Sequence, residues 1–127
     1  MKQLMWVCLG SALGGGARYL LSGWVQNRVG LGFPLGTVFV NLVGSFLIGV
    51  VMYAGVRAAA FSTLVRVTLA VGVLGGFTTF SSFTYETMDR MQAGAWGAAV
   101  GNVVLSVLGC LFMCCLGWAG TRYVIGG

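Results

Sequence analysis

Long stretches without a charged side chain constrain this sequence more than any other feature. No charge occurs in 29–56, 67–85 or 91–121, and 3–27 contains only Arg18. Since about 20 helical residues cross a hydrocarbon core of about 30 Å, each stretch is long enough for one span. The sequence therefore predicts an all-α membrane protein with four transmembrane helices in one domain. That domain covers 1–127, with approximate spans at 4–25, 35–56, 66–90 and 95–122.

The composition excludes several other classes of protein. Of the 127 residues, 58% are hydrophobic and only 7% are charged, whereas a soluble domain carries about 25% charged residues. A soluble domain, a disordered chain and a coiled coil are therefore excluded. Lys2 before an apolar run also fits a cleavable signal peptide, which would leave three helices. Gly10 and Gly14, in GxxxG spacing, favour a retained helix with a packing face.

The basic residues are divided almost evenly between the two ends of the predicted spans. One end has Lys2, Arg57, Arg66 and Arg122, and the other has Arg28 and Arg90, with Arg18 nearer to that second end. Because loops rich in Lys and Arg stay in the cytoplasm, this split gives only a weak bias and fits insertion in either direction. No basic patch with interleaved aromatic residues predicts nucleic-acid binding.

The cysteines do not suggest a metal centre. The four cysteines, of which Cys110 and Cys114 lie one helical turn apart, form no CxxC pair, and the chain has no histidine. A thiolate site usually needs four ligands or help from histidine. We therefore favour apolar packing of the thiols over metal ligation.

Two predicted helices each carry polar side chains at a spacing of four residues. Thr37, Asn41 and Ser45 form one stripe, and a second stripe consists of Asn102, Ser106, Cys110 and Cys114. Such side chains join helices in membranes by hydrogen bonds, or they line the path of a polar solute. One stripe alone favours the joining role, but two stripes favour a lined path.

The third predicted span has an unusual centre. Residues 75–83 read Gly-Gly-Phe-Thr-Thr-Phe-Ser-Ser-Phe, and two glycines followed by two β-branched threonines form a poor helix. Broken backbone inside a bilayer is tolerated only where protein buries it or where it lines a cavity. Freed carbonyl oxygens suit a hard cation such as sodium. The alternative is an intact helix with a glycine packing notch.

The phenylalanines of this segment suggest an anion. Phe80 and Phe83 lie on nearly the same helical face, and Thr79, Ser81 and Ser82 supply hydroxyl groups around them. Because an aromatic ring is positive at its edge, ring edges and hydroxyl donors can surround a small anion. The alternative is that both rings are ordinary core residues.

The segments described above resemble the Fluc (CrcB) family of fluoride channels over the whole chain. The resemblance rests on the glycine-rich first helix that ends in Arg18, on 36–44 and most specifically on 75–83. The family more often has threonine where Ser82 stands. In the fourth helix Asn102, Cys110 and Cys114 depart from the family's aromatic and hydroxyl pattern.

This resemblance implies an antiparallel homodimer of dual topology, with two fluoride pores along the subunit interface. A heterodimer with a homologous chain is the alternative. It also implies a central sodium ion that is structural and not transported, held by the main-chain carbonyls of Gly75 and Thr78. Arg18 is given a vestibule or interface role. The implied fluoride pathway consists of Asn41, Thr79, Phe80, Ser81, Phe83 and Ser106.

The hypothesis that follows is passive, fluoride-selective conduction out of a bacterial cytoplasm, across the cytoplasmic (inner) membrane. Such a multi-pass channel reduces fluoride toxicity and is not an enzyme. A small drug/proton antiporter is the first alternative, but it would need a carboxylate inside the membrane, and the only acids, Glu86 and Asp89, lie near the end of the third helix. A structural assembly factor is the second alternative.

Overall fold

The computed structural model describes residues 1–30 and 32–126, and Leu31 and Gly127 lie outside the described residues. Those described residues form helices and loops, with no strand among them. Four helical segments are long and apolar enough to cross a membrane: Lys2–Val29, Leu35–Arg57, Thr63–Gln92 and Trp96–Ile125. The predicted all-α fold with four spans is therefore confirmed.

Two of the four spans are single helices, α1 (Lys2–Val29) and α6 (Trp96–Ile125). The second span is α2 (Leu35–Met52), which continues into the π-helical turn η1 (Tyr53–Arg57). The third span has four parts: α3 (Thr63–Val67), the π-helical segment η2 (Thr68–Val73), α4 (Leu74–Phe77) and α5 (Phe80–Gln92).

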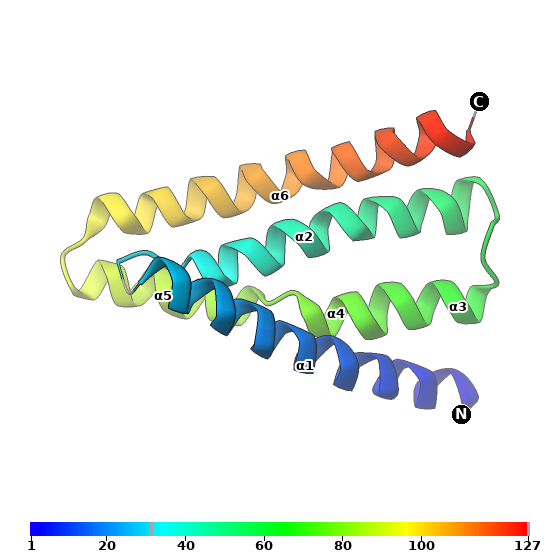
Figure 1. Ribbon diagram of the computed structural model, residues 1–127, viewed down its shortest axis with the longest axis horizontal. Helices are drawn as coiled ribbons and strands as arrows, with labels where there is room; N and C mark the ends of the chain where they lie inside the picture. The colour runs from blue at the N-terminus through cyan, green and yellow to red at the C-terminus, as the bar shows by residue number, and fades with distance from the viewer. Residues whose placement is uncertain (31, 127) are drawn as a thin grey trace.

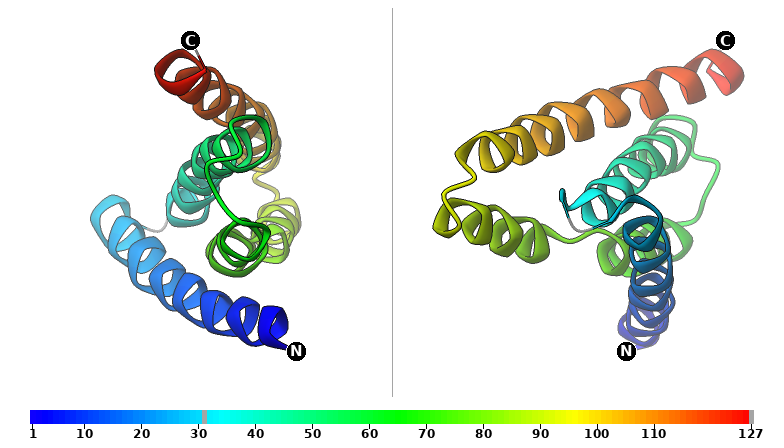
Figure 2. Two further views of the ribbon diagram at one scale, coloured as in Figure 1. Left: turned by 90° about the vertical axis from the view of Figure 1, so that its right-hand side faces the viewer. Right: turned by 60° about the vertical axis from the view of Figure 1, so that its left-hand side comes forward.

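Successive spans run in opposite directions, so that both termini lie at the same end of the molecule (Figure 1). Seen along the bundle in Figure 2, α1 and α6 lie on opposite sides, with α2 and the third span between them. The main packing partners of α1 are η2 and α4, whereas α6 packs on α2 and α5. The second and third spans therefore form the centre of the subunit.

Glycines allow α1 to lie directly on the third span. Gly10 and Gly14 are both buried, and a Cβ atom at Gly14 would collide with the carbonyl oxygen of Val73. From the other side, a Cβ at Gly76 would collide with the carbonyl oxygen of Ser11. The predicted packing face of the first helix is confirmed, because no side chain larger than hydrogen fits between these backbones.

Two residues with extended backbone separate α4 from α5. Thr78 has φ −87° and ψ 157°, and Thr79 has φ −148° and ψ 117°, which are values of the β region. Because both threonines are β-branched, they adopt extended backbone readily. We call Thr78 and Thr79 the α4–α5 junction; it lies near the middle of the third span (Figure 1).

Most of the outer surface is apolar. Large side chains are exposed along the outer helices, among them Leu13 and Leu20 of α1 and Leu111 and Phe112 of α6. A continuous apolar surface of this size suits lipid or another protein, because water would not solvate it. Together with the four long apolar helices, it marks a multi-pass membrane protein.

Candidate functional site

The side-chain amide of Asn41 holds the α4–α5 junction to α2. Its Nδ2 donates to the carbonyl oxygen of Thr79 at 2.9 Å, and its Oδ1 accepts from the Thr79 backbone N–H at 2.7 Å. One side-chain amide therefore bonds both the N–H and the C=O of Thr79, and the N–H has no helical acceptor because it donates to Asn41. Asn41 is 9% exposed, so this pairing takes place away from bulk solvent.

The same geometry removes the helical partners of two carbonyl groups. In an unbroken helix, the C=O of Gly75 would accept from the N–H of Thr79 and the C=O of Thr78 from that of Ser82. Here the Thr79 N–H donates to Asn41. The Ser82 N–H donates instead to the Thr79 hydroxyl at 3.2 Å, which caps α5. Gly75 and Thr78 therefore lose their regular helical donors.

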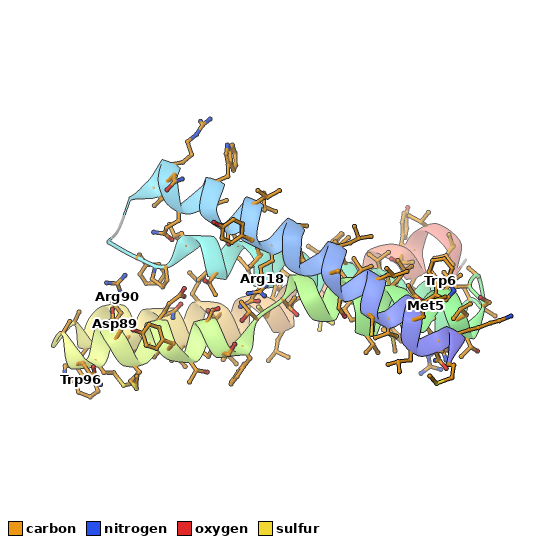
Figure 3. All side chains as sticks on the ribbon, turned by 90° about the horizontal axis from the view of Figure 1, so that it is seen from below. Met5, Trp6, Arg18, Asp89, Arg90 and Trp96 are labelled. Carbon is orange, nitrogen blue, oxygen red and sulfur yellow. The ribbon has the colours of Figure 1, made fainter. Side chains whose placement is uncertain are left out.

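Arg18 binds the backbone directly beside this junction. Its Nε donates to the carbonyl oxygen of Gly76 at 3.0 Å, and Figure 3 shows the side chain where α1 crosses the third span. This bond places the guanidinium on a main-chain carbonyl of α4, so Arg18 joins the first and third spans.

A cavity of about 350 Å³ lies beside the α4–α5 junction, between α2, the third span and α6. Its lining includes every predicted site residue except Ser81 and Arg18: Asn41, Gly75, Thr78, Thr79, Phe80, Phe83 and Ser106. Ser81 is exposed and does not line the cavity. The walls are otherwise small or apolar: Gly44, Ser45, Ile48, Ala70, Leu74, Val107 and Cys110.

Phe80 and Phe83 meet at the wall of this cavity but differ in exposure. Their ring centroids are 5.3 Å apart and their planes are tilted by 57°. Phe83 is 8% exposed and is part of the core, whereas Phe80 is 76% exposed. Phe80 is therefore not a core residue of the single subunit, and the two rings do not share one environment.

The second polar stripe divides into two parts. Asn102, which is 1% exposed, donates from Nδ2 to the hydroxyl of Thr87 at 2.9 Å and accepts from Ser106 at 3.3 Å. The Thr87 hydroxyl then donates to the carbonyl oxygen of Phe83. The Asn102 part therefore joins α6 to α5, while Ser106 and Cys110 reach the cavity.

Sequence reasoning did not place Glu86 near this site. Its Oε1 accepts a hydrogen bond of 2.7 Å from the Thr37 hydroxyl, one turn along α2 from Asn41. The other oxygen, Oε2, is buried and has no hydrogen-bond partner among the described residues. The sequence spacing could have indicated this position, because Thr79, Phe83 and Glu86 lie on one helical face.

The thiols are all free. Cys110 lines the cavity, whereas Cys114 is absent from its lining and Cys8 and Cys115 are exposed. Among residues 1–30 and 32–126, no three His, Cys, Asp or Glu side chains lie close enough to hold a metal ion.

These features define a four-span membrane protein with an irregular, polar centre in its third span. Residues 5–118 match the family described as "CrcB-like protein, Camphor Resistance (CrcB)", and the chain belongs to this family.

Curated relatives of this chain carry the name "Fluoride-specific ion channel FluC", among them three that match it over most of its length. The protein of Anaeromyxobacter dehalogenans is 49% identical over 111 residues, which cover 87% of this chain and 88% of the relative. The protein of Geotalea daltonii is 45% identical over 98% of this chain and 100% of its own length. The protein of Sorangium cellulosum is 40% identical over the full length of both chains.

Proposed function

We propose that this protein is a fluoride-selective channel and not an enzyme, and that the cavity beside the α4–α5 junction is part of its fluoride pathway. The observation that carries the proposal is the convergence of Asn41, Thr79, Phe80, Phe83 and Ser106 on this one cavity. The names of the relatives, which match over nearly the whole chain, support it. Conduction involves no covalent step, and the ion moves passively down its electrochemical gradient.

In this proposal, neutral donors replace the water around a small anion. Asn41 keeps one amide hydrogen beyond the one it gives to Thr79. The hydroxyls of Thr79 and Ser106, which donate to Ser82 and Asn102 in the single subunit, would turn toward the ion to add further donors. The positive edges of Phe80 and Phe83 complete the set. Selectivity follows from the narrowness of the path and from how well its donors replace hydration, both of which disfavour a larger anion such as chloride.

The cavity needs another wall, which we propose comes from a second copy in antiparallel orientation. Phe80 is 76% exposed and Gly75 is also exposed in the single subunit, although both lie beside the polar centre of a membrane protein. A second copy would cover both residues and enclose the path. The almost even division of basic residues between the two ends supports dual insertion.

We further propose that a structural sodium ion binds the main-chain carbonyls of Gly75 and Thr78. The loss of their regular helical donors fits this role, because a hard cation prefers oxygen ligands. Each copy offers two such carbonyls, so two copies together would offer four. When bound, the ion would supply positive charge at the centre without being transported. Within this chain, Asn41 fixes the backbone that presents these oxygens.

The remaining parts of the proposal concern physiology. The relatives are bacterial proteins, and the four apolar spans require a membrane. We propose the bacterial cytoplasmic membrane as the location and outward movement of fluoride as the direction. Passive efflux of this kind lowers cytoplasmic fluoride and so reduces its toxicity.

The decisive experiment is fluoride efflux from liposomes that contain the pure protein, recorded with a fluoride electrode. Fluoride release through a passive channel requires valinomycin, because potassium must carry the balancing charge. A proton-coupled antiporter would also take up protons as it released fluoride, whereas a passive channel would not, so the internal pH is recorded alongside. We expect Asn41→Ala and Phe80→Ala to reduce the rate sharply. Thr121→Val removes a hydroxyl at the far end of α6, where it donates to Gly117, and should leave the rate unchanged. Folded protein without efflux above empty liposomes would refute the proposal.

The sodium proposal has its own test. Prolonged exchange of sodium for a bulky organic cation should reduce fluoride efflux slowly, because a structural ion leaves slowly, and sodium should restore it. Immediate loss would indicate a transported ion instead. Unchanged activity after complete exchange would contradict a sodium site at Gly75 and Thr78 without affecting the channel assignment.

A further inference from the structure

A second cavity lies far from the α4–α5 junction. It has a volume of about 340 Å³ and is lined by Tyr53 and Arg57 of η1 and by Trp118 and Arg122 of α6. These residues belong to the C-terminal ends of the second and fourth spans, at the end of the molecule where both termini lie (Figure 1). The fluoride pathway proposed above uses none of them.

Aromatic rings form the wall of this cavity. The rings of Tyr53 and Trp118 meet edge to face, with centroids 5.1 Å apart and an angle of 86°. The guanidinium carbon of Arg57 lies 5.8 Å from the centre of the Trp118 ring, within the range of a cation–π contact. The Tyr53 hydroxyl makes no hydrogen bond with the described residues and lies beside the backbone of Gly126.

Among the described residues, the two positive charges have no acidic partner. Neither Arg57 nor Arg122 forms an ion pair with a described residue, and both side chains are exposed. The only acidic side chains, Glu86 and Asp89, belong to α5 at the opposite end. Figure 3 shows Asp89 at that end. Two guanidinium groups that line one cavity repel each other, and an anion between them would relieve this repulsion.

The position of this cavity indicates where that anion comes from. Arg57 and Arg122 lie at the ends of apolar spans, and Tyr and Trp are the aromatic residues that concentrate at the membrane–water interface. Basic pockets between transmembrane helices at this level bind the head groups of anionic lipids. The planar fork of a guanidinium also matches phosphate oxygens in pairs.

We propose that this cavity binds the phosphate group of an anionic phospholipid. Arg57 and Arg122 pair with the phosphate oxygens, the Tyr53 hydroxyl donates to the head group, and Trp118 holds Arg57 in place. The site is independent of fluoride conduction, so its test and that of the channel can fail separately.

The test is native mass spectrometry of the full chain in detergent, titrated with phosphatidylglycerol or with zwitterionic phosphatidylcholine. We expect preference for phosphatidylglycerol and about thirtyfold weaker binding in the double variant Arg57→Gln/Arg122→Gln. The matched control is Arg28→Gln. Arg28 also stacks on a tryptophan, Trp24, at 5.0 Å, but it lies at the other end and does not line this cavity. This control should bind phosphatidylglycerol as the wild type does.

Two further measurements distinguish the effect of charge from that of guanidinium geometry or misfolding, and a bound lipid from free phosphate. The variant Arg57→Lys/Arg122→Lys keeps both charges but loses the planar forks, so it should bind with intermediate affinity even if the glutamine variant does not fold. Millimolar inorganic phosphate should fail to displace the lipid. Equal weakening in Arg28→Gln, or unchanged binding in the double glutamine variant, would overturn the proposal. Displacement of the lipid by inorganic phosphate would overturn the assignment to a lipid.

Discussion

Replacement of Asn41 by alanine tests whether a single amide holds the α4–α5 junction. The change removes the hydrogen bonds of 2.9 Å and 2.7 Å that join Asn41 to the backbone of Thr79. Side-chain hydrogen bonds in membrane proteins contribute about 0.6 kcal/mol each on average, which gives a lower bound of about 1.2 kcal/mol for the pair.

The loss should exceed this bound because the N–H of Thr79 would remain in place without a partner, whereas its carbonyl oxygen, at the N-cap of α5, still accepts from the helix. A buried polar group that loses its partner costs about 1–3 kcal/mol. The Thr79 N–H can regain part of this by donating to the Gly75 carbonyl, as in a regular helix. We therefore expect the free energy of unfolding to fall by about 2 kcal/mol.

The assay is reversible unfolding in detergent, followed by tryptophan fluorescence. Ser45→Ala is the matched control, because Ser45 lies one turn further along the same stripe, lines the same cavity and makes no hydrogen bond with the described residues. This control should stay within about 0.5 kcal/mol of the wild type. Hydrogen exchange at the Thr79 amide should accelerate in Asn41→Ala alone. If Asn41→Ala destabilises no more than Ser45→Ala, the amide does not hold the junction.

Two other substitutions test the packing around the site. Gly14→Ala should destabilise the protein by about 2 kcal/mol or more, because the added Cβ would collide with the Val73 carbonyl. At Gly16 an added Cβ meets open space, so Gly16→Ala should be neutral or stabilising. Equal melting temperatures of the two variants would refute this packing argument. Asn102→Leu should lower stability by about 1 kcal/mol, because it breaks two hydrogen bonds, one of them to Thr87. A melting temperature no lower than that of the wild type would contradict that role.

The fold was largely predictable because hydrophobic length alone determines how many helices cross a bilayer. Four stretches with at most one charged side chain, 3–27, 29–56, 67–85 and 91–121, indicated the spans, and the described residues form four. The glycine face of α1 was also predictable, since GxxxG spacing is a local property of one helix. Its partner was not, because no local pattern indicates that Gly14 meets Val73.

The candidate site was predictable in its residue types but not in their partners. Spacing placed Thr37, Asn41 and Ser45 on one face, yet only the tertiary structure shows that the first meets Glu86 and the second meets Thr79. Arg18 illustrates the same limit. The sequence does not indicate which group the guanidinium of a lone arginine in an apolar helix binds. The bond from Arg18 to the Gly76 carbonyl depends on where α1 crosses the third span.

The sequence by itself determined that this protein lies in a lipid bilayer, how many spans it has, and that helix propensity is weak from Gly75 to Thr79. These follow from hydrophobicity and from local backbone preference, which are properties of neighbouring residues. Only the tertiary structure decided which polar groups meet at that weak point and which side chains line a common cavity. Those outcomes depend on contacts between distant segments, and in a bilayer every displaced backbone group must find such a partner.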